Sequence, residues 1–144
     1  MAGASRYFER GSRPTSDATR PPRFLSVDLD VPEVEAAPGV WMRPVFGDRL
    51  NLSLVRMEPH AVAAAHEHSE EQIGFVLEGS CDLELGDETR TLRAGDVYVA
   101  PPFVAHGARA HEDGCRILDA FSPLREALRQ LFDQALARDA HPDG

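Results

Sequence analysis

The feature that most constrains the fold is a series of short apolar segments, closely spaced along the middle of the chain. They span residues 40–46, 51–57, 72–79, 81–86, 89–92, 97–100 and 115–121. Leu50, Leu52 and Leu54 alternate with polar residues, as do Leu83 and Leu85, which is the period-two pattern of strands. Many short strands without intervening helices predict an antiparallel sandwich or barrel.

Glycine, proline and aspartate separate these segments. Turns are predicted at Glu78-Gly79-Ser80, Gly86-Asp87-Glu88 and Ala94-Gly95-Asp96, because these residue types favour tight turns. The strands are therefore expected to be joined mostly by short connections.

The end of the chain changes from a period of two to the period of an α-helix. Ser122 followed by Pro123 has the residue types of an N-cap and a first helical position, which predicts a helix over residues 123–138. Its apolar stripe consists of Leu124, Leu128, Leu131, Phe132, Ala135 and Leu136. This helix is expected to pack on the barrel or against a second subunit.

The chain of 144 residues is expected to form one domain with a substantial core. Residues 1–23, with five arginines against Glu9 and Asp17, are predicted to be a disordered arm or one that wraps a partner subunit. The barrel is assigned to residues 24–122, and residues 139–144 form a tail.

The charge and the residue types exclude several functions. The net charge of −9 disfavours nucleic acid as a partner. All 15 basic residues are arginines, which excludes a lysine Schiff base. No apolar run approaches the ~18 residues of a membrane span, and the N-terminus lacks the apolar stretch of a secretory signal. We therefore expect a cytoplasmic protein in which Cys81 and Cys115 are reduced and buried.

Three histidines have the spacing of a metal site. His66 and His68 lie one residue apart, so both imidazoles share a face if the backbone is extended. His106 follows a later strand, and an antiparallel barrel would bring it to the same pocket. Three imidazoles suit Zn²⁺, Fe²⁺, Ni²⁺ or Cu²⁺ and are a poor set for Ca²⁺ or Mg²⁺. Glu71 and Gln72 compete for a fourth ligand position.

Two segments, HEHSEEQIGFVLEG (66–79) and GDVYVAPPFVAHG (95–107), resemble the two motifs of the cupin superfamily, in order and with the same internal spacing. His60, Phe103 and Ala110 stand where the motifs have glycine, glycine and asparagine. The resemblance covers roughly residues 40 to 121. It implies an all-β cupin double-stranded β-helix, a jelly-roll barrel, followed by one C-terminal α-helix.

The family spacing implies that Gln72, not Glu71, holds the ligand position. The metal ligands expected from the resemblance are thus His66, His68, Gln72 and His106. Gln72 either coordinates directly or hydrogen-bonds a bound water. Adjacent strand residues point to opposite faces, so Glu71 should turn away, and Glu70 is also expected on the outer face.

Together with these motifs, LDAFSPLRE (118–126) is similar to small monocupins of the pectin-degradation type, which act on unsaturated uronates, and to monocupin cyclases of aromatic polyketide biosynthesis. The resemblance implies catalytic roles for Asp119, as a general base, and Arg125, as an anion or enolate clamp. The alternative is a structural carboxylate at Asp119 and a solvated Arg125.

The predicted substrate pocket contains aromatic and sulfur-bearing side chains that could equally be core residues. Its members are Trp41, Met57, Phe75, Tyr98, Phe103 and Phe121. Tyr98 is either a proton donor or wall packing. His60 and His111 are expected to be exposed, although either could add a fourth histidine.

The favoured function is a metal-dependent enzyme acting on an enolisable carbonyl substrate, with a polyketide cyclase as the specific hypothesis. Uronate ring opening or isomerisation, an Fe(II) dioxygenase and a non-catalytic metal or small-molecule binding module are the alternatives. One divalent transition metal per subunit is expected, with zinc as first choice and Fe(II) or Ni as alternatives. The resemblance also implies a homodimer joined through its N-terminal strands.

Overall fold

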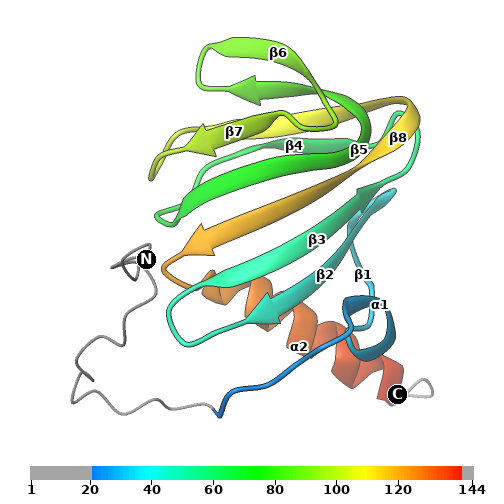
Figure 1. Cartoon of the computed structure of the whole chain (residues 1–144), viewed down its shortest axis with the longest axis vertical. Helices are drawn as coiled ribbons and strands as arrows, with labels where there is room; N and C mark the ends of the chain where they lie inside the picture. Colours follow the sequence, from blue (N-terminus) through cyan, green and yellow to red (C-terminus); the bar gives the residue numbers. More distant parts are fainter. Residues whose placement is uncertain (1–20, 141–144) are drawn as a thin grey trace, which may run out of the picture.

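Two long strands, β5 (Glu71–Leu85) and β8 (His106–Ser122), run through the whole structure and pair with each other along their lengths (Figure 1). The structure is a computed structural model and describes residues 21–140. The other elements are α1 (Val27–Asp30), β1 (Val34–Ala37), β2 (Val40–Phe46), β3 (Asn51–Met57), β4 (Val62–His66), β6 (Glu88–Arg93), β7 (Val97–Ala100) and α2 (Glu126–Ala140).

All strand pairs are antiparallel, in the order β1-β2-β3-β8-β5-β6, with β4 on β8 and β7 on β5. β8 pairs with β4 through its first residues and with β3 through its last. β5 pairs with β7 first and then with β6. The sheet therefore folds over on itself, and its two halves enclose one core (Figure 1). The predicted antiparallel barrel with one C-terminal helix is confirmed.

The fold-over occurs at Gly79, where a turn was predicted. The turn prediction is wrong, because β5 continues through this point and only its register with β8 shifts. Gly79 has φ of 71°, and a Cβ there would lie 2.1 Å from the carbonyl oxygen of Gly114. A bulge with glycines on both strands lets the two backbones cross closely. The Gly86-Asp87 turn, by contrast, is confirmed as the connection between β5 and β6.

Substituting Gly79 with alanine should destabilise the fold by about 2–4 kcal/mol, because the new Cβ would collide with backbone that cannot move aside. Urea unfolding followed by circular dichroism measures this. Gly95→Ala is the matched control: its φ is also positive, at 96°, but nothing lies within 4 Å of the added Cβ. Equal losses in both variants would show that φ strain, not the close crossing, sets the cost.

The leucine alternation in β3 marks a strand as predicted, but the leucines lie on the outer face. Asn51, Ser53, Val55 and Met57 are the buried residues of this strand. The core between the two halves of the sheet also contains Cys81 and Cys115, and both are buried, free thiols as predicted.

The C-terminal helix begins later than predicted. Ser122 is the last residue of β8 and pairs with Glu71, so it is not the helix N-cap, and α2 starts at Glu126. The backbone N–H of Arg125 instead donates to the side-chain oxygen of Asn51, 2.8 Å away. Leu128 of α2 packs against Phe46 and Phe121, so the helix closes one end of the barrel.

The predicted arm and tail fall mostly outside the described residues, at positions 1–20 and 141–144. Of the arm, Arg23 is described, and its guanidinium donates a hydrogen bond to the carbonyl oxygen of Phe46 on β2. Neither of the described helices is long and apolar enough to cross a membrane.

Candidate metal centre

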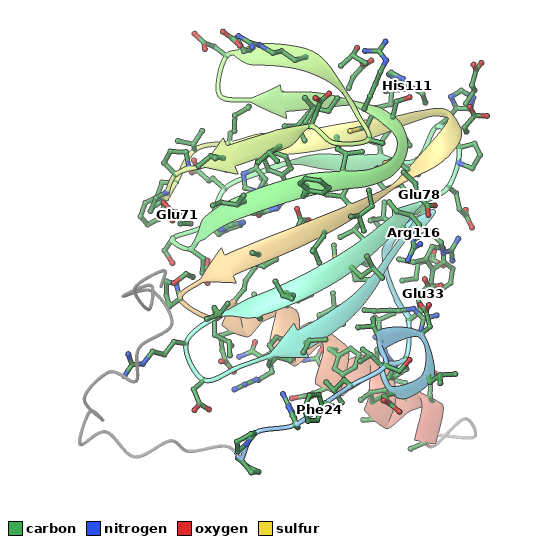
Figure 2. All side chains as sticks on the ribbon, viewed as in Figure 1. Phe24, Glu33, Glu71, Glu78, His111 and Arg116 are labelled. Carbon is green, nitrogen blue, oxygen red and sulfur yellow. The ribbon has the colours of Figure 1, made fainter. Side chains whose placement is uncertain are left out.

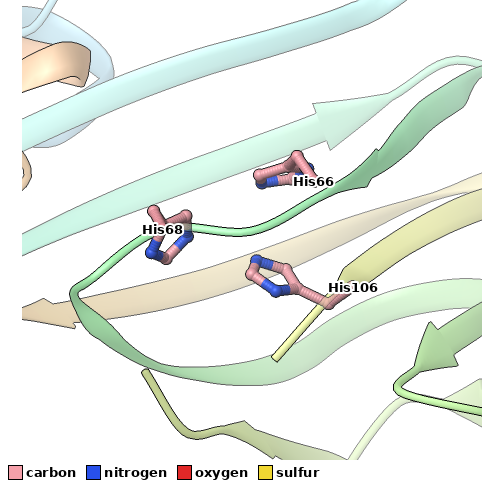
Figure 3. A group of neighbouring side chains, drawn as sticks. All are labelled: His66, His68 and His106. Atoms are coloured by element: carbon pink, nitrogen blue, oxygen red, sulfur yellow. The ribbon is translucent and has the colours of Figure 1, made fainter. Parts of the chain in front are cut away.

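Three histidine side chains converge at one end of the barrel (Figure 3). His66 is the last residue of β4 and pairs directly with His106, the first residue of β8, while His68 follows in the loop before β5. One ring nitrogen from each lies within 4.8 Å of the others, and the His66 and His106 ring centroids are 4.5 Å apart. The three histidines therefore lie on two paired strands and on the loop that follows the first of them.

The orientation of each imidazole is fixed by a backbone carbonyl two residues away. Nδ1 of His66, His68 and His106 lies 2.8, 3.0 and 2.9 Å from the carbonyl oxygens of residues 64, 70 and 104, respectively. A carbonyl only accepts hydrogen bonds, so each Nδ1 carries the proton. In the neutral ring Nε2 then keeps its lone pair, the arrangement that metal-ligating histidines adopt.

Gln72 completes the cluster from β5. It is 4% exposed, and its Oε1 lies 3.0 Å from Nε2 of His68 and 2.9 Å from Nε2 of His106. Its amide nitrogen donates to the hydroxyl of Tyr98, at 2.6 Å, which orients the amide oxygen towards the histidines.

The lone pairs of His68, His106 and Gln72 are arranged as a metal ion would require. Burial lowers the pKa of His68 and His106, so both rings are neutral near pH 7. Lone pairs on their Nε2 atoms then face the lone pairs of the Gln72 oxygen at hydrogen-bond distance with no proton between them. A cation removes that repulsion, so the donor set fits a divalent transition metal.

The two glutamates beside Gln72 differ in position. Glu71 is exposed at the start of β5 (Figure 2), on the opposite face of the strand from the buried Gln72, as predicted. The prediction for Glu70 is wrong, because its side chain is only 14% exposed and its Oε2 lies 3.3 Å from Nδ1 of His68. Glu70 precedes β5, so the alternation of strand faces does not apply to it.

His66 and His106 line a partly open cavity between the two halves of the sheet, with about 60 Å³ of space. Met57, Tyr98 and Phe121, three of the predicted pocket residues, line it. The sequence did not single out its other apolar walls, which are Val40, Met42, Val55, Ala63, Leu83, Ala108 and Ile117.

The other three predicted pocket residues lie elsewhere, which corrects that prediction. Trp41 lies beneath the guanidinium of Arg56, 5.4 Å from it, and Phe75 lies on the outer face of β5. Phe103 is exposed in the loop before β8. His60 is exposed and His111 bonds to Ser80 and Asp82, so neither belongs to the histidine cluster found among residues 21–140.

A chain of hydrogen bonds links Gln72 of the cluster to a buried acid. The Tyr98 hydroxyl receives its hydrogen bond from Gln72 and donates to Oδ1 of Asp119, 2.7 Å away. Asp119 lines the cavity, and burial raises its pKa to about 6. A carboxyl group with this pKa can give and take protons near neutral pH.

Gly74 makes room for this chain and was not predicted as a site residue. It pairs with Tyr98 on one side and with Asp119 on the other. A Cβ at Gly74 would lie 2.0 Å from the Tyr98 ring and 2.6 Å from Oδ1 of Asp119. The only sequence signal for it is a glycine inside an otherwise apolar strand, which often marks a close approach.

Arg125 brings a positive charge to the cavity wall. Its guanidinium lies 5.6 Å from the ring centroid of Phe121 and forms no ion pair within 4.0 Å in the described part of the chain. Its Nε is buried without a hydrogen-bond partner. A cation left without a partner beside a cavity is suited to bind an anionic group of a ligand.

The folded-over antiparallel sheet and its His₃Gln cluster define a class: a small β-barrel with a candidate metal site inside one end. The cupin domain family model matches residues 53–121, and the chain belongs to the cupin superfamily.

Comparisons with known proteins give more specific relatives. The pectin degradation protein KdgF from Dickeya dadantii (strain 3937) is 31% identical over 105 residues, covering 72% of this chain and 96% of that protein. The solved structure of KdgF from Halomonas sp. is 33% identical with a TM-score of 0.64, covering 67% of this chain and 92% of the other. H2HPP isomerase from Bacillus subtilis is 45% identical over 56 residues, 38% of this chain and 24% of that protein.

Proposed function

We propose that this protein is a metal-dependent isomerase that acts on a small enolisable carbonyl compound bearing a carboxylate. Ring opening or isomerisation of an unsaturated uronate, as in pectin degradation, is the specific reaction we favour. The observation that carries the proposal is one small cavity lined by His66, Gln72 and His106 of the His₃Gln cluster, by the buried Asp119 and by Arg125, which forms no ion pair with residues 21–140. The relatives named for pectin degradation and for an isomerase support it.

His66, His68, Gln72 and His106 would hold one divalent transition metal, and zinc is our first choice. All four ligands are neutral, so they leave the charge of the ion uncompensated. A bound metal of this kind supplies Lewis acidity that polarises a carbonyl and stabilises an enolate.

The remaining steps fall to residues around the cavity. The Arg125 guanidinium binds the substrate carboxylate and so orients the carbon next to the carbonyl. For the unsaturated uronate, Asp119 would take the proton of the anomeric hydroxyl, and the bond between C1 and the ring oxygen breaks as C1 becomes an aldehyde and C5 an enolate. Asp119 would then return the proton to C4, so that C5 becomes a ketone and the isomerisation needs no other reagent. Tyr98 donates to one oxygen of Asp119 and leaves the second oxygen for the substrate proton.

The polyketide cyclase hypothesis gains no support from these relatives, which favour the uronate alternative instead. The cavity is also small, which suits a compact substrate better than a long extended chain. An Fe(II) dioxygenase would need the same ligands, but the isomerase relative favours proton transfer over oxygen chemistry. A non-catalytic binding module would bind the same acids without turnover.

The proposal is tested with a 4,5-unsaturated galacturonate and the metal-loaded enzyme, following loss of the conjugated ultraviolet absorbance. Arg125→Ala should raise KM by about ten- to a hundredfold, because the substrate carboxylate loses its charged partner. Arg129→Ala is the matched control, since Arg129 lies in the first turn of α2, just after Arg125, with its guanidinium over Phe46 and outside the cavity. Binding without turnover in the wild-type enzyme would favour the binding module.

A further inference from the structure

Three glutamates lie close to His68 in the sequence, and only one of them is turned towards its ring. Glu67 and Glu71 are exposed, whereas the side chain of Glu70 is only 14% exposed. Oε2 of Glu70 lies 3.3 Å from Nδ1 of His68, whose own side chain is 10% exposed. Burying a carboxylate is costly unless positive charge lies nearby, so the position of Glu70 calls for a source of that charge.

The loop before β5 holds Glu70 and His68 together. The carbonyl oxygen of Glu70 lies 3.0 Å from Nδ1 of His68, and the carbonyl oxygen of His68 accepts a hydrogen bond from the backbone N–H of Phe103. Nδ1 of His68 therefore lies close to two oxygens of the same glutamate. Nε2, on the other side of the ring, faces the Gln72 oxygen and the remaining histidines of the cluster (Figure 3).

Glu70 has no cationic partner in contact with it. Among residues 21–140, His68 is the only basic side chain within 4.0 Å of its carboxylate, and burial keeps that ring neutral near pH 7. Burial lowers the pKa of Arg125, and the negative charges of Glu70 and Asp119 act in the opposite direction. The carboxylate of Glu70 thus lies near Arg125 without pairing with it.

We propose that Glu70 is a positioning residue that strengthens His68 as a metal ligand. This inference rests on the metal centre of the proposed function. When Nε2 of His68 gives its lone pair to a cation, positive charge spreads over the imidazole and Nδ1–H becomes a stronger donor. A carboxylate beside Nδ1 stabilises that charge and fixes the plane of the ring. The four ligands are neutral, so Glu70 brings to them a negative charge that they lack.

Zinc affinity of the full chain, measured by competition with a chromophoric chelator, tests this proposal. Glu70→Gln should bind zinc about 10- to 100-fold more weakly, the usual effect of removing a carboxylate that supports a ligating histidine. Glu71→Gln is the matched control, because it removes the same charge one residue away at an exposed position. Its zinc affinity should stay within about threefold of wild type, since salt screens exposed charges.

Two further measurements separate this role from a merely structural one. The Tm of metal-free Glu70→Gln should equal or exceed that of the metal-free wild type, because the variant removes a largely buried charge. The absorption spectrum of the cobalt-loaded protein should shift in Glu70→Gln and stay unchanged in Glu71→Gln, because the spectrum reports the donor strength of the ligands. Glu70→Asp keeps the charge but draws it back from the ring, so it should lose less zinc affinity than Glu70→Gln.

Equal zinc affinity in Glu70→Gln and Glu71→Gln would overturn the proposal. So would equal losses in Glu70→Gln and Glu70→Asp, or a metal-free Tm that falls together with the affinity, because support of the fold would then explain the effect. If Glu70→Gln fails to fold, Glu70→Asp is compared with Glu71→Asp instead. No substrate is used, so inactivity towards the uronate would leave this result intact, whereas a wild-type protein that binds no zinc would overturn the proposed function as well.

Discussion

Replacing His106 with alanine should lower metal affinity by about a hundredfold or more and reduce turnover to background. The variant loses the ligand that joins the two paired strands, and the Gln72 oxygen loses one of its two nitrogen neighbours. Loss of supporting contacts alone typically costs 10- to 100-fold, so losing a ligand itself should cost at least as much. Metal content after dialysis, measured by elemental analysis, gives the result directly.

Thermal unfolding gives a second reading that does not depend on activity. A chelator should lower the Tm of the wild-type protein by roughly 5–10 °C, because a metal at a hundred times its Kd stabilises the fold by about 2.7 kcal/mol. The Tm of His106→Ala should not respond to the chelator. His111→Ala is the control, since the imidazole of His111 bonds to Ser80 and Asp82 and lies outside the histidine cluster. Full metal content in His106→Ala would refute the metal centre.

The barrel was predictable because its strands carry a period-two pattern, but the sequence could not show which face is inside. In β3 the interior positions include Asn51 and Ser53, while Leu52 faces out, the reverse of what hydrophobicity suggests. The same ambiguity misplaced Phe75, which shares the outer face.

Strands with weak apolar signals were missed for a different reason. β4 has the sequence VAAAH, whose alanines contribute little hydrophobicity, and the first half of β8 is mostly polar. The residue types around Gly79 favour a tight turn and a β-bulge equally. The choice depends on Gly114, which lies far along the chain and crosses at close range.

The histidine cluster was predictable because His66 and His68 lie one residue apart and an antiparallel barrel of the cupin type would bring His106 to the same pocket. The hydrogen bonds from Gln72 through Tyr98 to Asp119 were not, since they join three different strands. The contact of Glu70 with His68 could not be predicted either, because Glu70 lies in the loop before β5, where side chains do not alternate between two faces. Contacts between strands thus decide the polar details of the site.

Replacing Asp119 with asparagine should lower kcat by about 10²- to 10⁴-fold, the usual contribution of a general base, and leave metal content unchanged. Asparagine has the same shape, and its amide oxygen can still accept the hydrogen bond from Tyr98. It cannot accept the proton of the substrate's anomeric hydroxyl. The measurement is steady-state turnover of the unsaturated uronate, with metal content determined on the same preparation.

The same variant separates a catalytic from a structural role for this buried acid. Burial raises the pKa of Asp119, so the charged form makes the fold less stable as pH rises through about 6. Asparagine removes that charge, and the Tm at pH 8 should therefore stay level or rise while kcat falls. A lower Tm with kcat largely retained would instead identify Asp119 as a structural residue whose charge the fold requires, and proton transfer would then have to be assigned to another group in the cavity.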